Sequence, residues 1–269
     1  MTDELEPFFD DQNNERRNGT LMPPENFVSS FRTFESEHPV WEDADILRAI
    51  QDPNRVPRRQ LFGNAWIVNQ LKHGSCQGMA TAGILSKARY LRGLTDGLIL
   101  SGAWIYSLTN FGRDSGSNPE DGMKVVQASG APPASLVTPN MIFPNLQPAS
   151  AKAEAMKHRG LDCYAVQTKQ GFRTALASGF PVVVVVSAGN NFQKLNAAGI
   201  AGADPGNGDH AISADDLCIV NGTEVIDCAN SWGLHYGQNG RVYLTWDSFA
   251  SPFNRFTFYA CTSTEEAGE

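Results

Sequence analysis

The sequence predicts an α+β protein in which helices precede strands, and three observations support this class. Residues 54–145 carry apolar side chains at helical spacing, residues 146–269 are dominated by short strand-like runs, and residues 1–53 show neither pattern over most of their length. A chain of 269 residues with 41% hydrophobic content can bury a large core. We therefore predict an N-terminal extension (1–53), a helical lobe (54–145) and a strand-rich lobe (146–269).

The N-terminal extension is acidic and interrupted by prolines. The chain has 21 Lys and Arg against 29 Asp and Glu, and the excess of acid lies almost entirely in residues 1–53. A short helix is predicted near residues 42–51, where apolar side chains share one face, and the rest is predicted to be irregular. The chain has no basic stripe, so we expect no nucleic-acid partner.

Capping signals delimit the predicted helices of the first lobe. Ser75 is a good N-cap residue for a helix over 76–91, and Gly93 follows its end. A second helix is predicted over 101–109. A third begins after Asn118, with proline in its first position, and ends at Gly130.

The second lobe begins with two predicted helices, over 151–158 and 171–178, and continues mainly as strands. The turn formed by Asn221 and Gly222 is a strong hairpin signal. The predicted strands cover 163–168, 181–187, 210–214, 217–220, 224–229, 240–246 and 255–261.

Apolar runs and cysteine spacing exclude several classes of protein. The longest apolar run, Val182–Val186, is far too short to cross a membrane, and the acidic N-terminus does not resemble a secretory signal. The five scattered cysteines include no C-x-x-C pair, and the spacing of Cys218, Cys228, His210 and His235 fits no standard zinc pattern. We expect reduced thiols, a cytoplasmic protein, no membrane partner, no metal and no cofactor.

Cys76 differs from the other cysteines because it opens a predicted helix, after Gly74 and Ser75. The positive end of a helix dipole favours a thiolate, and a histidine beside it would complete a nucleophilic pair. By itself, without the later segments, Cys76 is better interpreted as a small buried residue.

Two later segments favour the nucleophile. His210 opens an apolar strand, and Asn230 begins the sequence Asn-Ser-Trp-Gly. These segments resemble the papain-like cysteine peptidases, and the resemblance covers about residues 54–262. His210 lies 134 residues after Cys76 and Asn230 lies 154 after it, against about 130–150 for both partners in papain-like enzymes. The sequence looks like a divergent bacterial- or phage-type member.

The resemblance implies a two-lobed fold, in which a helical lobe packs against an antiparallel β-barrel-like lobe and the active site lies between them. It implies that Cys76 attacks as a thiolate and that His210 carries the proton. Asn230 would orient His210, and Trp232 would shield that hydrogen bond. Gln70, six residues before the nucleophile, would donate to the oxyanion together with the backbone N–H of Cys76.

Two positions depart from the family pattern. Gln77 replaces the usual tryptophan after the nucleophile, which removes an aromatic wall beside the site. His73 stands where the family has a disulfide-forming cysteine. Neither change removes a group that the chemistry needs, and we expect both His73 and His235 to be rim or surface residues.

The resemblance implies a thiol-dependent peptidase that acts on polypeptides through an acyl-enzyme. Two alternatives stay open: a papain-fold structural or interaction protein within a larger assembly such as a virus particle, and a thiol acyltransferase on the same triad. Residues 1–53 are either an inhibitory pro-segment or an arm that docks on an assembly partner. We favour the arm, because the segment is short and irregular.

Overall fold

The structure is a computed structural model of the chain. It describes residues 5–10, 12–21, 23–24, 26–206, 208–249 and 258–264. The main helices are α1 (Phe34–Glu37), α2 (Asp43–Ile50), α3 (Arg58–Phe62), α4 (Cys76–Leu91), α5 (Gly102–Thr109), α6 (Pro119–Ser129), α7 (Ala151–Ala155), α8 (Lys169–Ala177) and α9 (Asn190–Gln193). The strands are β1 (Phe8–Phe9), β2 (Glu15–Arg16), β3 (Gly160–Val166), β4 (Val182–Val186), β5 (Ile200–Ala201), β6 (His210–Val220), β7 (Thr223–Ala229), β8 (Arg241–Leu244) and β9 (Phe258–Thr264).

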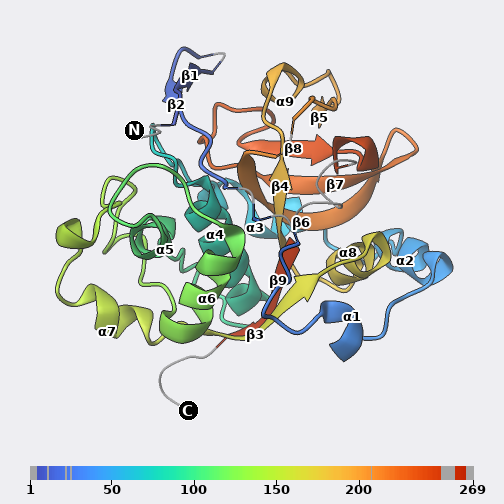
Figure 1. Cartoon of the computed structure of the whole chain (residues 1–269). Coiled ribbons are helices and arrows are strands. Elements are labelled where there is room, and N and C mark those ends of the chain that lie inside the picture. Colours follow the sequence, from blue (N-terminus) through green and yellow to red (C-terminus); the bar gives the residue numbers. More distant parts are fainter. Residues whose placement is uncertain are drawn as a thin grey trace.

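Helices α4 to α7 gather on one side of the molecule, and most of the strands lie on the other (Figure 1). We call these the helical side and the sheet side. Helix α4 is buried along most of its length because α5 and α6 cover it on one flank and the sheet covers it on the other. Helices α4 and α5 approach so closely that a Cβ atom on Gly78 would lie 2.4 Å from the carbonyl oxygen of Gly102. The sequence therefore needs glycine at this crossing.

Seven strands form one sheet in the order β3-β9-β4-β6-β7-β8-β5. All neighbours are antiparallel except β5 and β8, and no pairing of the described residues closes the sheet into a barrel. The alternation of side chains divides the core. Val183 and Ala211 pack against the helical side, whereas Val184 and Ile212 pack on the opposite face near Phe172 of α8. A two-lobed α+β fold is thus confirmed, with an open sheet in place of a barrel-like lobe.

Most of the long elements lie where the sequence predicts them, and the differences have local causes. The predicted strands over 210–214 and 217–220 form the single strand β6, in which a register shift between Ala214 and Asp216 absorbs the interruption. Helix α7 ends at Ala155, three residues early, and α8 begins at Lys169 because the Thr168 side chain caps it. The predicted strand over 255–261 is observed from Phe258, and its first three residues lie outside the described residues.

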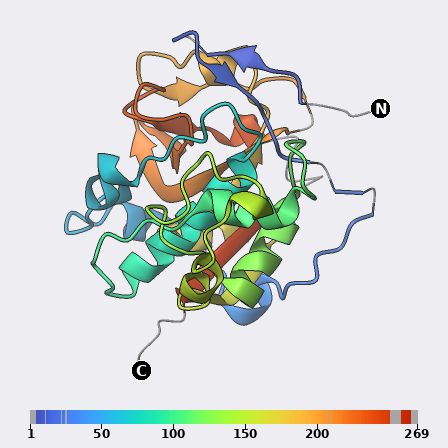
Figure 2. The ribbon, with the colours of Figure 1, turned by 90° about the vertical axis from the view of Figure 1, so that its left-hand side faces the viewer.

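The N-terminal extension has more structure than its sequence predicts. Strands β1 and β2 pair as a small ribbon at one end of the molecule, and the chain then runs along the boundary between the two sides toward α1 (Figure 1). A view turned by 90° shows the same path over the outer surface of the molecule (Figure 2). Thr33 forms a parallel bridge with Ala165 of β3, so the path is fixed beyond the ribbon as well. Among the described residues, no helix is both long and apolar enough to cross a membrane.

Candidate active site

Cys76 lies at the start of α4 and is fully buried. Its sulfur accepts a hydrogen bond from the backbone N–H of Gly19 at 3.3 Å and contacts Thr20 Oγ1 at 3.4 Å. Ser75 is the N-cap residue of this helix, as predicted, but its hydroxyl makes no capping bond and has no partner among the described residues. The free N–H groups of the first turn of α4 therefore have no side-chain cap.

His210 and Asn230 come together across neighbouring strands. His210 begins β6, Asn230 follows the last residue of β7, and Nε2 of the imidazole lies 2.8 Å from Oδ1 of Asn230. The Trp232 ring lies over the imidazole with 4.8 Å between ring centres, and both side chains are buried. Among the described residues Nδ1 of His210 has no other hydrogen-bond partner, which leaves it available to the sulfur of Cys76.

Cys76 and His210 shift each other's protonation in opposite directions. Burial alone would raise the pKa of the Cys76 thiol, but the charge of His210 and hydrogen bonds from His210 and Thr20 lower it below its ordinary value. Burial alone would lower the pKa of His210, but the Cys76 thiolate and the bond to Asn230 raise it. The two shifts favour a thiolate–imidazolium pair over two neutral groups.

Gln70, six residues before Cys76, is fully buried, and its side-chain amide is held by three hydrogen bonds. Its Oε1 accepts from the hydroxyl of Ser231 at 2.6 Å, which fixes the orientation of the amide. Its Nε2 donates to the carbonyl of His73 at 2.7 Å and to the carbonyl of Arg17 at 3.0 Å. The family resemblance implies that the amide of Gln70 donates to the oxyanion. In this structure the same amide already donates to the backbone carbonyl of Arg17, which belongs to the N-terminal extension.

Residues 15–21 of the extension, which we call the cleft segment, lie between the two sides. On the helical side, the backbone N–H of Ser117 donates to the carbonyl of Gly19 at 2.8 Å. On the sheet side, the N–H of Thr20 donates to the carbonyl of Asp209 at 2.9 Å. A Cβ atom on Gly19 would lie 1.7 Å from the carbonyl oxygen of Gly74, so the segment fits here only because that residue is glycine.

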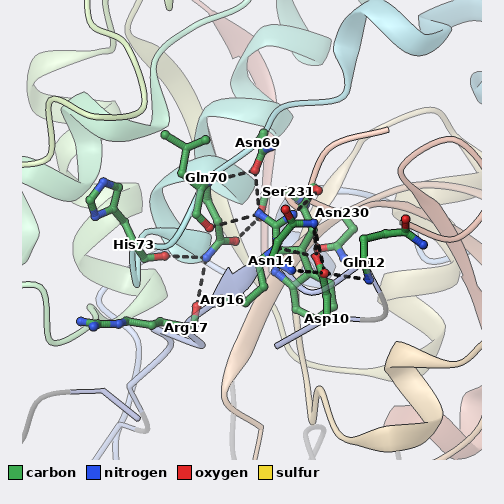
Figure 3. A network of polar contacts seen from close by, with 12 residues as sticks. Asp10, Gln12, Asn14, Arg16, Arg17, Asn69, Gln70, His73, Asn230 and Ser231 are labelled. Atoms are coloured by element: carbon green, nitrogen blue, oxygen red, sulfur yellow. Dashed lines mark hydrogen bonds and ion pairs between the residues drawn. The ribbon is translucent and has the colours of Figure 1, made fainter. Parts of the chain in front are cut away.

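Arg16 anchors the cleft segment at its N-terminal end (Figure 3). Its guanidinium pairs with Asp10 at 2.9 Å, and both side chains are less than 10% exposed. It also donates to Asn69 Oδ1 and to the carbonyl of Trp232, each at 2.8 Å. One arginine therefore connects the extension to the loop that carries Gln70 and to the loop that carries Asn230.

Comparison with known proteins identifies the family. The sequence pattern of the papain family of cysteine proteases matches residues 53–251, about three quarters of the chain. The chain belongs to this family. It is a cysteine protease by descent, and polypeptides are its expected class of substrate. A comparison with curated proteins finds no match.

Solved structures of papain-like proteases share the fold at low identity. The cysteine protease xylellain from Xylella fastidiosa matches with a TM-score of 0.67 and 17% identity, over 94% of this chain and 98% of xylellain. A procathepsin B from Trypanosoma congolense matches with a TM-score of 0.62 and 18% identity, over 91% of this chain and 87% of its own. The proform of the ragweed pollen cysteine protease Amb a 11 matches with a TM-score of 0.61 and 17% identity, over 80% and 68% of the two chains.

The two family departures have structural roles in this papain-family chain. Gln77 is fully buried, its Nε2 donates to Thr81 Oγ1 at 2.9 Å, and its Oε1 accepts from Ser117 Oγ at 2.8 Å. Gln77 therefore does not replace the family's tryptophan as an exposed wall beside the active site. His73 lies at the rim, as expected, but it pairs with Asp114 at 3.1 Å. His235 is exposed.

Sequence reasoning missed the groups that complete the cleft, namely the cleft segment, Ser117 and Asp114. None of them belongs to a local motif that marks it, and their importance comes from contacts with distant parts of the chain. Gly116 and Asn118 are ordinary turn and cap residues in the sequence. Among the described residues, no three His, Cys, Asp or Glu side chains are placed to hold a metal ion.

Proposed function

We propose that this papain-family chain cleaves peptide bonds with Cys76 and His210 as its reacting pair, and that its own cleft segment keeps it latent. The observation that carries the proposal is a polypeptide already seated at the nucleophile. The carbonyl of Arg17 lies 3.0 Å from Gln70 Nε2, and the N–H of Gly19 lies 3.3 Å from the sulfur of Cys76. The cleft therefore accepts an extended backbone beside the thiol.

In the proposed reaction, the Cys76 thiolate attacks the carbonyl carbon of the substrate, and the oxygen takes the negative charge. Gln70 Nε2 and the backbone N–H of Cys76 would donate to that oxygen. The imidazolium of His210 then gives its proton to the leaving amine, and the C–N bond breaks to leave a thioester on Cys76. A water molecule gives its proton to His210 and attacks the thioester, which releases the acid and restores the thiolate.

Asn230 and Trp232 act through His210. The bond between His210 Nε2 and Asn230 Oδ1 would hold the imidazole in the orientation that leaves Nδ1 available to the sulfur. Trp232 covers this bond and excludes water from it. The two residues thereby keep the imidazole oriented through both proton transfers.

The same contacts explain how the cleft segment would block the site. The N–H of Gly19 donates to the sulfur of Cys76 at 3.3 Å and Thr20 Oγ1 lies 3.4 Å from it, so polar groups of the segment already engage the nucleophile. Thr20 also pairs in parallel with Ser117. These contacts support the pro-segment over the docking arm as the role of this part of residues 1–53.

Removal of the nucleophile tests the proposal. We expect Cys76→Ala to abolish hydrolysis of peptides by the full chain, whereas Cys163→Ala, which changes a thiol that is equally buried but remote from His210, leaves the rate nearly unchanged. Hydrolysis by the Cys76→Ala chain would refute the assignment. Addition of an amine acceptor separates hydrolysis from acyl transfer, because only the latter yields a new amide as the main product.

A further inference from the structure

One carboxylate connects the two loops that form the helical wall of the cleft. The backbone N–H of Gly74, two residues before Cys76, donates to Asp114 Oδ1 at 2.9 Å. The hydroxyl of Tyr106 donates to the same oxygen at 2.8 Å. That hydroxyl in turn accepts a hydrogen bond from the backbone N–H of Gly116 at 2.9 Å. The nucleophile loop and the loop over 114–117 are thus joined through Asp114.

The second oxygen of the carboxylate is also engaged. Asp114 Oδ2 lies 3.1 Å from His73 Nδ1, and each of these side chains is 17% exposed. Burial alone would raise the pKa of Asp114, but hydrogen bonds from His73, Tyr106 and Gly74 lower it below its ordinary value. The carboxylate is therefore ionised, and its hydrogen bonds are of the stronger, charge-assisted kind.

The loop over 114–117 ends in the edge on which an extended chain lies. The N–H of Ser117 donates to Gly19, and the carbonyl of Ser117 accepts from the N–H of Leu21 at 3.1 Å. A Cβ atom on Gly116 would lie 2.6 Å from the carbonyl oxygen of Gly19, so the contact is close. The side chain of Gln77 holds the hydroxyl of Ser117 at 2.8 Å as a second link to α4.

We propose that Asp114 is a positioning residue that sets the distance between the sulfur of Cys76 and the peptide-binding edge at Ser117. This inference rests on the proposed function. It explains how an extended substrate is aligned with the thiol of Cys76. Neither loop belongs to a helix or strand at these positions, so their separation depends on side-chain contacts. A misplacement of about 1 Å can cost about 100-fold in rate, which makes such a link important for catalysis.

The first test uses the full chain and needs no activity. In Asp114→Ala, we expect the amide hydrogens of Ser117 and Leu21 to exchange at least about ten times faster, because the edge that pairs with the cleft segment loosens. Asp96→Ala is the matched control. Asp96 also accepts a backbone N–H, from Leu98 at 3.0 Å, and pairs with Arg89 at 3.1 Å, but it contacts neither cleft loop. Unchanged exchange in Asp114→Ala, or an equal change in both variants, would overturn the inference.

The second test compares two reagents for the Cys76 thiol in a full chain that carries Gly19→Val to displace the cleft segment. Iodoacetamide needs only the thiolate, whereas a peptidyl epoxide must also bind along the edge at Ser117. We expect Asp114→Ala to slow the epoxide by about 10- to 100-fold and iodoacetamide by no more than about two-fold. Asp114→Asn, which keeps an acceptor for Gly74 and Tyr106, should recover part of the loss.

The outcomes of the second test separate the inference from the proposed function. Neither reagent requires hydrolysis. A chain that both reagents label but that cuts no peptide therefore refutes the peptidase activity. The role of Asp114 is then judged from the ratio of the epoxide rate to the iodoacetamide rate. A ratio that Asp114→Ala does not change, or that Asp96→Ala changes equally, refutes the positioning role while hydrolysis persists. Should Gly19→Val leave the thiol unreactive, the hydrogen-exchange result decides.

Discussion

On the sheet side of the cleft, His210 and Asn230 lie at the ends of paired strands, whereas on the helical side Cys76 depends on hydrogen bonds between loops. His210 pairs with Val186 across the ladder, and the rings of Phe192 and Trp232 lie 5.7 and 4.8 Å from its centre. The loop before Cys76 is instead held by polar side chains. The sheet side is thus fixed by regular pairing and apolar packing, and the helical side by a few polar atoms.

This difference indicates how each side responds to a single change. On the sheet side, many contacts keep the backbone in place when one polar atom is lost, so such a change acts on the chemistry directly. On the helical side, the loss of one acceptor moves a loop, and the position of the sulfur or of the binding edge moves with it. The predictions below test these two behaviours, and rates refer to a full chain that carries Gly19→Val.

Outside the reacting pair of Cys76 and His210, the largest expected effect is at Gln70. In Gln70→Ala we expect kcat/KM to fall by about 10²–10³, mostly in kcat, because the amide would stabilise charge that exists only in the transition state. Gln147→Ala is the control, since that amide also donates to backbone carbonyls, of Met141 and Phe143, but lies away from the cleft. An effect confined to KM would make Gln70 a substrate-binding residue.

Trp232 should show the direct behaviour of the sheet side. In Trp232→Ala we expect kcat to fall by about ten-fold, the rate equivalent of weakening one hydrogen bond, that between His210 and Asn230. Trp246→Ala is matched to it, because Trp246 packs on Phe172 in the same sheet side and donates its indole N–H to Glu224. Equal losses in both variants would show that the effect is one of general packing.

The pH dependence of kcat/KM tests the reacting pair. The pKa of Cys76 is lowered, so the thiolate persists below the ordinary thiol range, and the pKa of His210 is raised, so the imidazolium persists above the ordinary histidine range. Because both charged forms are needed, we expect a bell-shaped profile, with the thiolate lost on the acid limb and the imidazolium lost on the basic limb. The usual pKa of a free thiol is about 8.5. A profile that only rises toward that pH would exclude a thiolate–imidazolium pair of Cys76 and His210.

The smallest effect on rate should come from a charge network between α4 and β6, which affects stability instead. Lys87 of α4 pairs with Asp215 of β6, and both side chains are no more than 1% exposed. Lys87→Met should lower the free energy of unfolding by about 3–5 kcal/mol, because it breaks a buried pair. Lys157→Met, at the exposed pair with Glu154, should cost less than about 1 kcal/mol by urea denaturation. Similar losses for the two would contradict the role of burial.

Local signals in the sequence account for the parts of the fold that were predicted well. The predicted cap Asn118 accepts from the backbone as expected, and Asn221 and Gly222 adopt the positive φ angles of a tight hairpin. Ser101, the first residue of the predicted second helix, is its N-cap in the structure. The four site residues stand in family motifs and in the family's order, so the sequence could point to them together: Gln70, Cys76, His210 and Asn230. Each of these inferences depends on residues close in sequence or on a known order of motifs.

The cleft segment and Asp114 could not be found in this way. Gly19 contacts a sulfur 57 residues away, and its fit depends on the carbonyl of Gly74. Asp114 bonds a backbone N–H 40 residues away, and its own neighbourhood is an unremarkable turn. Such contacts depend on how two loops meet in space, and periodicity and capping signals carry no information about that.

The central claim, that a peptidase site is covered by its own cleft segment, is tested most directly by Gly19→Val in the full chain. The added side chain cannot fit against the carbonyl of Gly74, so the segment must leave the cleft. We expect peptide hydrolysis to rise several-fold over the unaltered chain and to vanish again when Cys76→Ala is added. Hydrolysis that stays the same in Gly19→Val, or that survives Cys76→Ala, would contradict the account.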